Sequence, residues 1–233
     1  MESKQNLVLI PGLVCDQQVW QHQHKFLKDI AEITIIPADS GETMESMAAH
    51  ALNLAPNVFA LAGFSMGGYI ALEMLRQAPH RITRLALLDT SSKSDTSEKF
   101  ESRLKAIAAC KSGNFNGVIE GMFEVLLHSD HQQSNLRAFV KDMAMRVGSD
   151  TFCLRHKAMM TRCDSTELLL QTKIPVRAIC GRQDAMSSVQ DHEEIADNAS
   201  HGKLSIIEEC GHMTILERPH AATALLRDWM RYD

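Results

Sequence analysis

The sequence predicts an α/β fold in which a mostly parallel sheet of about six strands is flanked by helices. Two observations lead to this prediction. Short apolar runs alternate with amphipathic helical patterns over most of the 233 residues, and this alternation is interrupted at residues 91–170, where only helical periodicity remains. The length suits one α/β domain, alone or with an insertion.

The apolar runs and the helical patterns fix the expected elements. We expect strands at Asn6–Ile10, Glu32–Ile36, Asn57–Ala62, Arg84–Leu88, Pro175–Cys180 and Leu204–Ile207. We expect helices at Gln17–Leu27, Thr43–Ala55, Met66–Gln77 and Leu216–Met230. Thr43 is the expected cap of its helix, since a threonine hydroxyl accepts a hydrogen bond from the first turn.

Residues 91–170 are interpreted as a helical cap inserted after the Arg84–Leu88 strand. The insertion opens with a polar linker over residues 90–95, and it leaves 1–90 and 171–233 as the core. It holds five of the eight phenylalanines and five of the thirteen methionines. These side chains form either the interior of the cap or an adaptable apolar wall facing a small-molecule substrate.

Composition excludes several classes of function. The chain has 24 basic and 29 acidic residues without a block of like charge, which argues against a nucleic-acid or membrane surface. No signal peptide or membrane-spanning run is present, so we expect a cytoplasmic protein with reduced cysteines. The six cysteines form no C-x-x-C pair, and we expect no metal and no cofactor. The sequence leaves the oligomeric state open.

Gly63-Phe64-Ser65-Met66-Gly67 lies between an expected strand and an expected helix. Glycines allow the backbone to turn tightly and neighbouring chains to pass closely, so the serine hydroxyl would be presented at the N-terminus of the helix. Such a placement suits a nucleophile, and Ser65 is the candidate.

A serine nucleophile needs a base, and the base needs a carboxylate that orients it. His212 follows the last expected strand and Asp184 follows the strand before it, which gives the chain order Ser65, Asp184, His212. Two alternatives remain open. Asp184 could instead cap the helix near Val189, and Asp89, which follows the Arg84–Leu88 strand, could be the acid.

Acyl transfer also needs two backbone N–H groups that stabilise the developing oxyanion. We assign one to Met66, directly after the nucleophile, and the other to Leu13, in the loop after the first strand.

These motifs together resemble the α/β-hydrolase-fold serine hydrolases over nearly the full length of the chain. The resemblance rests on Pro11-Gly12 followed by Trp20, on Gly63 to Gly68, on Gly181 to Asp184, and on Gly211-His212 with Glu217-Arg218-Pro219 behind it. It implies a cap over the active site and points to small capped esterases, enol-lactone hydrolases and lyase-like members of the menaquinone pathway. Two departures are noted: Pro11-Gly12 replaces the usual His-Gly, and the short N-terminus leaves room for six strands, all parallel.

Three functions follow from these observations. The first is hydrolysis of a carboxylic ester, lactone or thioester of a small, largely apolar acyl group through an acyl-enzyme on Ser65. The second is a lyase or carbon–carbon hydrolase acting on an anionic substrate, for which the cap offers arginines. The third is a ligand sensor with little or no catalysis. The cap arginines are Arg103, Arg137, Arg146, Arg155 and Arg162.

Overall fold

The sheet has six strands, all parallel, in the part of the chain that the computed structural model describes, residues 4–233. The strand order is β2-β1-β3-β4-β5-β6, so the chain starts inside the sheet, crosses to one edge and then builds toward the other. The predicted parallel sheet of about six strands is confirmed. The strands are β1 (Gln5–Ile10), β2 (Ala31–Ile35), β3 (Phe59–Phe64), β4 (Ile82–Leu88), β5 (Val176–Gly181) and β6 (Gly202–Ile207).

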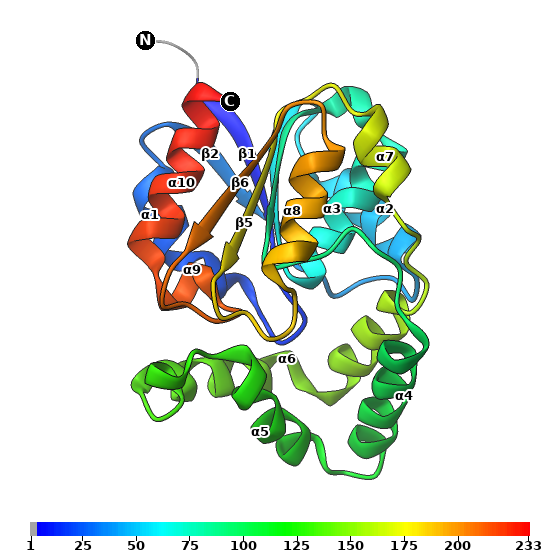
Figure 1. Cartoon of the computed structure of the whole chain (residues 1–233). Helices are drawn as coiled ribbons and strands as arrows, with labels where there is room; N and C mark the ends of the chain where they lie inside the picture. Colours follow the sequence, from blue (N-terminus) through cyan, green and yellow to red (C-terminus); the bar gives the residue numbers. More distant parts are fainter. Residues whose placement is uncertain (1–3) are drawn as a thin grey trace.

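Helices cover both faces of this sheet (Figure 1). α1 and α10 pack together on one face, while α2, α3 and α8 lie on the other. Every residue of β3 and β5 is buried, because both faces of these strands are covered, and Arg177 of β5 is the one charged residue among them. The helices of these layers are η1 (Gln17–Trp20), α1 (Gln21–Leu27), α2 (Met44–Leu54), α3 (Met66–Gln77), η2 (Pro79–Arg81), α8 (Val189–Asn198), α9 (Thr214–Glu217) and α10 (Pro219–Tyr232).

The chain between β4 and β5 is helical, as expected. α4, α5 and α6 lie together beyond the sheet in Figure 1, whereas α7 packs beside α8. We call α4, α5 and α6 the cap helices; the division of the chain into a core and a separate cap stays a prediction. No helix within residues 4–233 has the length and apolar character needed to cross a membrane. The helices of this segment are α4 (Ser97–Lys111), α5 (Phe115–Leu126), η3 (Ser129–His131), α6 (Asn135–Met159) and α7 (Thr166–Gln171).

Two long helices expected from the sequence are each divided in the structure. The helix expected at Gln17–Leu27 is a 3₁₀ turn, η1, followed by α1. The C-terminal helix is interrupted at Arg218, which has φ −128° and ψ 58°. Pro219 causes this break, because the residue before a proline is driven out of the helical region while proline itself suits the first helical position. Thr43 caps α2 as predicted, with Ser46 completing a capping box.

The segment expected to be a polar linker packs against the core. Thr90, Ser91 and Ser92 are buried, and the Thr90 hydroxyl donates a hydrogen bond to the carbonyl of Ser65 at 2.8 Å. The start of the insertion is therefore tied to the turn that carries the candidate nucleophile.

Two glycines bring β1, β3 and α3 into close contact. A Cβ on Gly63 would lie 2.3 Å from the carbonyl oxygen of Gly67, and a Cβ on Gly67 would lie 2.3 Å from the carbonyl oxygen of Ile10. Backbone atoms occupy the space in both cases, so no side-chain movement could relieve the overlap. The start of α3 consequently rests directly on the end of β1.

Gly67→Ala is expected to destabilise the protein by ~1–3 kcal/mol, because the new methyl group forces the backbones of α3 and β1 apart. Gly121→Ala in α5 is the matched control, since its Cβ would meet no atom within 4 Å. This control gains about 0.5–1 kcal/mol from helix propensity. Urea unfolding of both variants measures the difference, and equal stability would contradict the packing argument.

Candidate active site

Ser65 occupies a strained turn between β3 and α3. Its φ of 53° and ψ of −118° are unfavourable for a residue with a Cβ. Hydrogen bonds hold this conformation: the Ser65 N–H donates to the Leu88 carbonyl at 2.8 Å, and the Ser65 carbonyl accepts from the N–H of Gly68 at 2.8 Å. The strain is thus maintained by the surrounding structure, and the hydroxyl lines a cavity.

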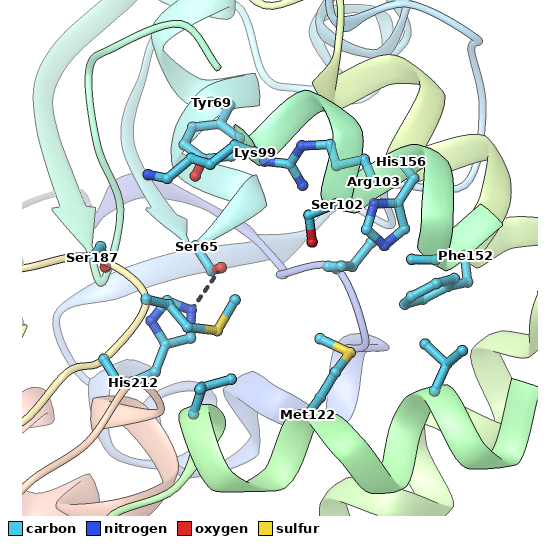
Figure 2. A pocket seen from close by; sticks show the side chains of 16 residues that line it. Ser65, Tyr69, Lys99, Ser102, Arg103, Met122, Phe152, His156, Ser187 and His212 are labelled. Carbon is cyan, nitrogen blue, oxygen red and sulfur yellow. Dashed lines mark hydrogen bonds between the residues drawn. The ribbon is translucent and has the colours of Figure 1, made fainter. Parts of the chain in front are cut away.

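A continuous hydrogen-bond chain connects Ser65 with His212 and Asp184. His212 Nε2 lies 2.9 Å from Ser65 Oγ (Figure 2). Its Nδ1 lies 2.8 and 2.9 Å from the two carboxylate oxygens of Asp184. An ionised carboxylate only accepts, so Nδ1 carries the proton and Nε2 is free to accept from the serine hydroxyl. The structure therefore brings the three predicted residues together in the order that proton transfer requires.

Asp184 is held ionised by its neighbours. Burial alone would raise its pKa, but His212 and the hydrogen bonds from His212 and Ser187 outweigh burial and lower the pKa to about 2. The backbone N–H groups of Met186 and Ser187 donate to Asp184 at 2.8 and 3.0 Å, and the Ser187 hydroxyl donates at 2.7 Å. The alternative role as a helix cap is wrong, since Ser188 caps α8 together with Asp191.

Asp89, the rival acid, has a different environment. It is fully buried at the end of β4, and its carboxyl group accepts from the N–H of Thr214 at 3.1 Å and from the Thr214 hydroxyl. Burial, followed by the nearby Asp184, raises the pKa of Asp89 well above its usual range. Its hydrogen bonds hold the segment after His212 rather than the imidazole.

Leu13 and Met66, the predicted oxyanion donors, both lie beside Ser65. Leu13 lines the cavity with Ser65, and a Cβ on the preceding Gly12 would lie 3.3 Å from the Cβ of Ser65. Met66 is buried and is the first residue of α3, so its N–H has no acceptor within the helix. Their role as donors stays a prediction.

Arg155 is a functional candidate for which the sequence carries no specific signal. It extends from α6, is 2% exposed, and donates to four backbone carbonyls of the core. Nε donates to Ala38 at 2.7 Å, and Nη1 contacts the carbonyls of Gly12, Leu13 and Cys15 at 3.3, 2.5 and 3.0 Å. The cap helix α6 thereby holds the loop that contains Leu13.

The other cap arginines have mostly acidic partners. Of the five, Arg103 is the one that lines the cavity beside Ser65 in the described part of the chain. Three others form ion pairs: Arg137 with Glu120, Arg146 with Asp16, and Arg162 with Asp95.

The cavity beside Ser65 has a volume of about 390 Å³ and lies between the core and the cap helices. Figure 2 shows Ser65 and His212 on one side, with Met122, Phe152 and His156 on cap helices around the rest. Two of the cap Phe and Met side chains, Met122 and Phe152, therefore line the cavity, while others, including Phe123 and Met143, are buried in the hydrophobic core. No group of three or more His, Cys, Asp or Glu residues suited to a metal ion occurs within residues 4–233.

Known proteins resemble this chain over most of its length. The Pimeloyl-[acyl-carrier protein] methyl ester esterase of Aromatoleum aromaticum is 25% identical over 98% of this chain and 99% of that protein. Monoacylglycerol lipase ABHD6 of Bos taurus is 23% identical over 97% of this chain and 75% of that protein. The structure of a thermophilic esterase from Thermogutta terrifontis superposes with a TM-score of 0.88 at 24% identity, covering 98% of this chain and 90% of that one.

The model of the alpha/beta hydrolase fold family matches residues 48–219, a span that runs from α2 to the start of α10 and includes Ser65, Asp184 and His212. The resemblance noted in the sequence is thus confirmed at the level of the family. By this match, the chain belongs to the alpha/beta hydrolase fold family.

Proposed function

We propose that this protein is a carboxylic-ester hydrolase that acts through an acyl-enzyme on Ser65. The observation that carries the proposal is the chain of hydrogen bonds from Ser65 Oγ through His212 to an ionised Asp184. The curated relatives named above are enzymes of ester substrates, a methyl ester esterase and a monoacylglycerol lipase, which supports this class of reaction.

In the first half-reaction, Ser65 Oγ attacks the ester carbonyl as His212 Nε2 takes the hydroxyl proton. Asp184 stabilises the imidazolium that forms. The carbonyl oxygen becomes negative and accepts from the N–H groups of Leu13 and Met66, and each such donor contributes ~3–4 kcal/mol to the transition state. The alcohol then leaves with the proton from His212, and the acyl group remains on Ser65.

Water completes the reaction. His212 Nε2 removes a proton from water, the resulting hydroxide attacks the acyl carbon, and the carboxylic acid leaves as Ser65 recovers its proton. Lactones and thioesters would react by the same steps. The apolar walls contributed by Val118, Met122 and Phe152 suit an apolar acyl segment.

Arg155 has a positioning role in this mechanism. All peptide bonds of the described chain are trans, so the Gly12 carbonyl and the Leu13 N–H, which belong to one planar peptide, point in opposite directions. Arg155 donates to the Gly12 carbonyl at 3.3 Å and the N–H of Cys15 donates to it at 3.2 Å, so Arg155 helps to fix the direction in which the Leu13 N–H points.

Ser65→Ala is expected to lower the turnover of p-nitrophenyl butyrate by at least ~10⁴-fold, because no other group can form the acyl-enzyme. Burst kinetics and labelling of Ser65 by a fluorophosphonate probe test the same step in the unaltered protein. Labelling without hydrolysis of any ester, lactone or thioester would favour the lyase. Absence of labelling would favour the sensor.

Asp184→Asn is expected to reduce kcat by about 10⁴-fold, since an amide in this position favours the wrong imidazole tautomer. Asp89→Asn serves as the paired variant and should retain most of the activity, because Asp89 does not contact the imidazole and an amide oxygen can still accept from Thr214. Ester turnover of both variants decides between the two aspartates. The reverse result would assign the acid to Asp89.

Arg155→Met is expected to lower kcat by on the order of 10–100-fold with little change in KM, less than the ~10²–10³-fold loss on removing an oxyanion donor outright. Arg146→Met is the control from the part of α6 before Gly148, where the helix is interrupted, because Arg146 contacts Asp16 and Gln18 at the surface. Thermal unfolding is measured alongside. A loss of stability without a selective loss of kcat would mean that Arg155 only holds the fold.

A further inference from the structure

His156 is a buried histidine without a partner. It extends from α6, is 6% exposed, and lines the cavity beside Ser65. Neither ring nitrogen has a hydrogen-bond partner within residues 4–233. Burial, together with the charge of Arg103, lowers the pKa of the imidazole to about 3, so the ring is neutral and offers one donor and one acceptor.

An unsatisfied buried polar group is costly and calls for an explanation in the native protein. Packing accounts for part of the ring, since Phe152 meets it edge-on with centroids 4.4 Å apart. The contact with Phe152 gives neither ring nitrogen a hydrogen-bond partner. Figure 2 shows His156 across the cavity from His212, beside Arg103 and Phe152. The imidazole lines the cavity although both of its nitrogens are buried, so a group inside the cavity becomes their partner once the ring rotates toward it.

The charge around the cavity is positive. Lys99 and Arg103 are among its sixteen lining residues, and none of the lining residues is acidic in the described chain. Arg103 binds Asp95 in a bidentate pair at 2.6 and 3.0 Å, but Asp95 also binds Arg162 at 2.6 Å. Two guanidinium groups thus share one buried carboxylate, and one positive charge remains.

The two basic lining residues also have free donor capacity. Nη1 of Arg103 has only the thioether of Met159 at 3.2 Å, and a thioether is a weak acceptor. Lys99 is exposed and forms no ion pair within residues 4–233. Donors without acceptors beside an uncompensated positive charge suit an anion.

We infer that the substrate carries, besides the scissile ester, an anionic group such as a carboxylate or phosphate that is bound by Lys99, Arg103 and His156. This inference rests on the proposed ester hydrolysis. The anion lies either on the acyl chain or on the alcohol, and in both cases it is held at the wall formed by α4 and α6 while the ester reaches Ser65.

Matched esters test the inference on the unaltered protein. The first pair is monomethyl adipate and its terminal carboxamide, which places the charge on the acyl chain. The second pair is butyryl glycolate and butyryl glycolamide, which places the charge on the alcohol. We expect kcat/KM to be on the order of 10-fold higher for the carboxylate in one pair, the magnitude of a hydrogen bond to a charged group. The responsive pair identifies the source of the anion, and equal or better turnover of both amides would overturn the inference.

Two variants locate the anion. Lys99→Gln should reduce the carboxylate-to-amide ratio by about 2–5-fold, as for an exposed charge. Lys105→Gln is the matched control on α4, because Lys105 does not line the cavity, and it should leave the ratio unchanged. If Lys99→Gln and Lys105→Gln lower the carboxylate-to-amide ratio equally, the preference arises from long-range electrostatic attraction, and this would contradict a bound anion.

His156→Leu separates binding from folding. If the ring nitrogens bind the ligand, the carboxylate-to-amide ratio falls in this variant. The melting temperature stays the same or rises by up to about 4 °C, because two buried polar atoms without partners are removed. A lower melting temperature with an unchanged ratio would mean that His156 is structural and would overturn its part in the site.

A binding measurement separates this inference from the proposed function. Adipate should raise the melting temperature more than adipamide does, whether or not the protein hydrolyses esters. If no ester is hydrolysed but adipate binds, the proposed function fails and the anion site stands. If esters are hydrolysed but adipate and adipamide behave alike, the anion site fails and the proposed function stands.

Discussion

The contact between the backbones of β1 and α3 is the constraint on which the rest of the site depends. Gly67 allows the first turn of α3 to rest on the carbonyl of Ile10, and Gly63 allows β3 to turn back beneath it. Ser65 can keep its unfavourable φ of 53° only because these close approaches and the bonds to Leu88 and Gly68 hold both flanks. The same approach brings the loop after β1, and with it Leu13, beside the hydroxyl.

The remaining groups follow from the parallel sheet, whose strands all end at one edge and so bring their following loops together. Two buried aspartates at that edge have pKa values shifted in opposite directions, because their neighbours differ. Asp184 receives donors from His212 and Ser187 and is held ionised, whereas Asp89, with Thr214 as its donor, has a raised pKa. Of these two carboxylates, the one with the lowered pKa, Asp184, is the one beside the imidazole.

The sequence predicts those parts of this arrangement that depend on local pattern. Apolar runs give the six strands, and residues directly after a strand give Ser65, Asp184 and His212. Pro219 carried a local signal as well, and the break at Arg218 could have been predicted from it. Arg155 and His156 could not be predicted, because their surroundings come from positions up to 143 residues away, as for Arg155 and Gly12. In the sequence, Arg155 resembles the other four cap arginines, and only the three-dimensional contacts distinguish a buried arginine on backbone carbonyls from one at the surface.

These two neighbouring residues give α6 a dual role. Successive residues of a helix point about 100° apart, so Arg155 reaches the loop of Leu13 while His156 reaches the cavity. The cap helix is therefore part of the machinery proposed for the oxyanion as well as a wall for the substrate. Changes to α6 intended to alter substrate preference would also bear on the carbonyls that Arg155 holds. This coupling argues that specificity can vary more freely on α4 and α5, whose cavity-lining residues have no comparable bond to the oxyanion loop in the described chain.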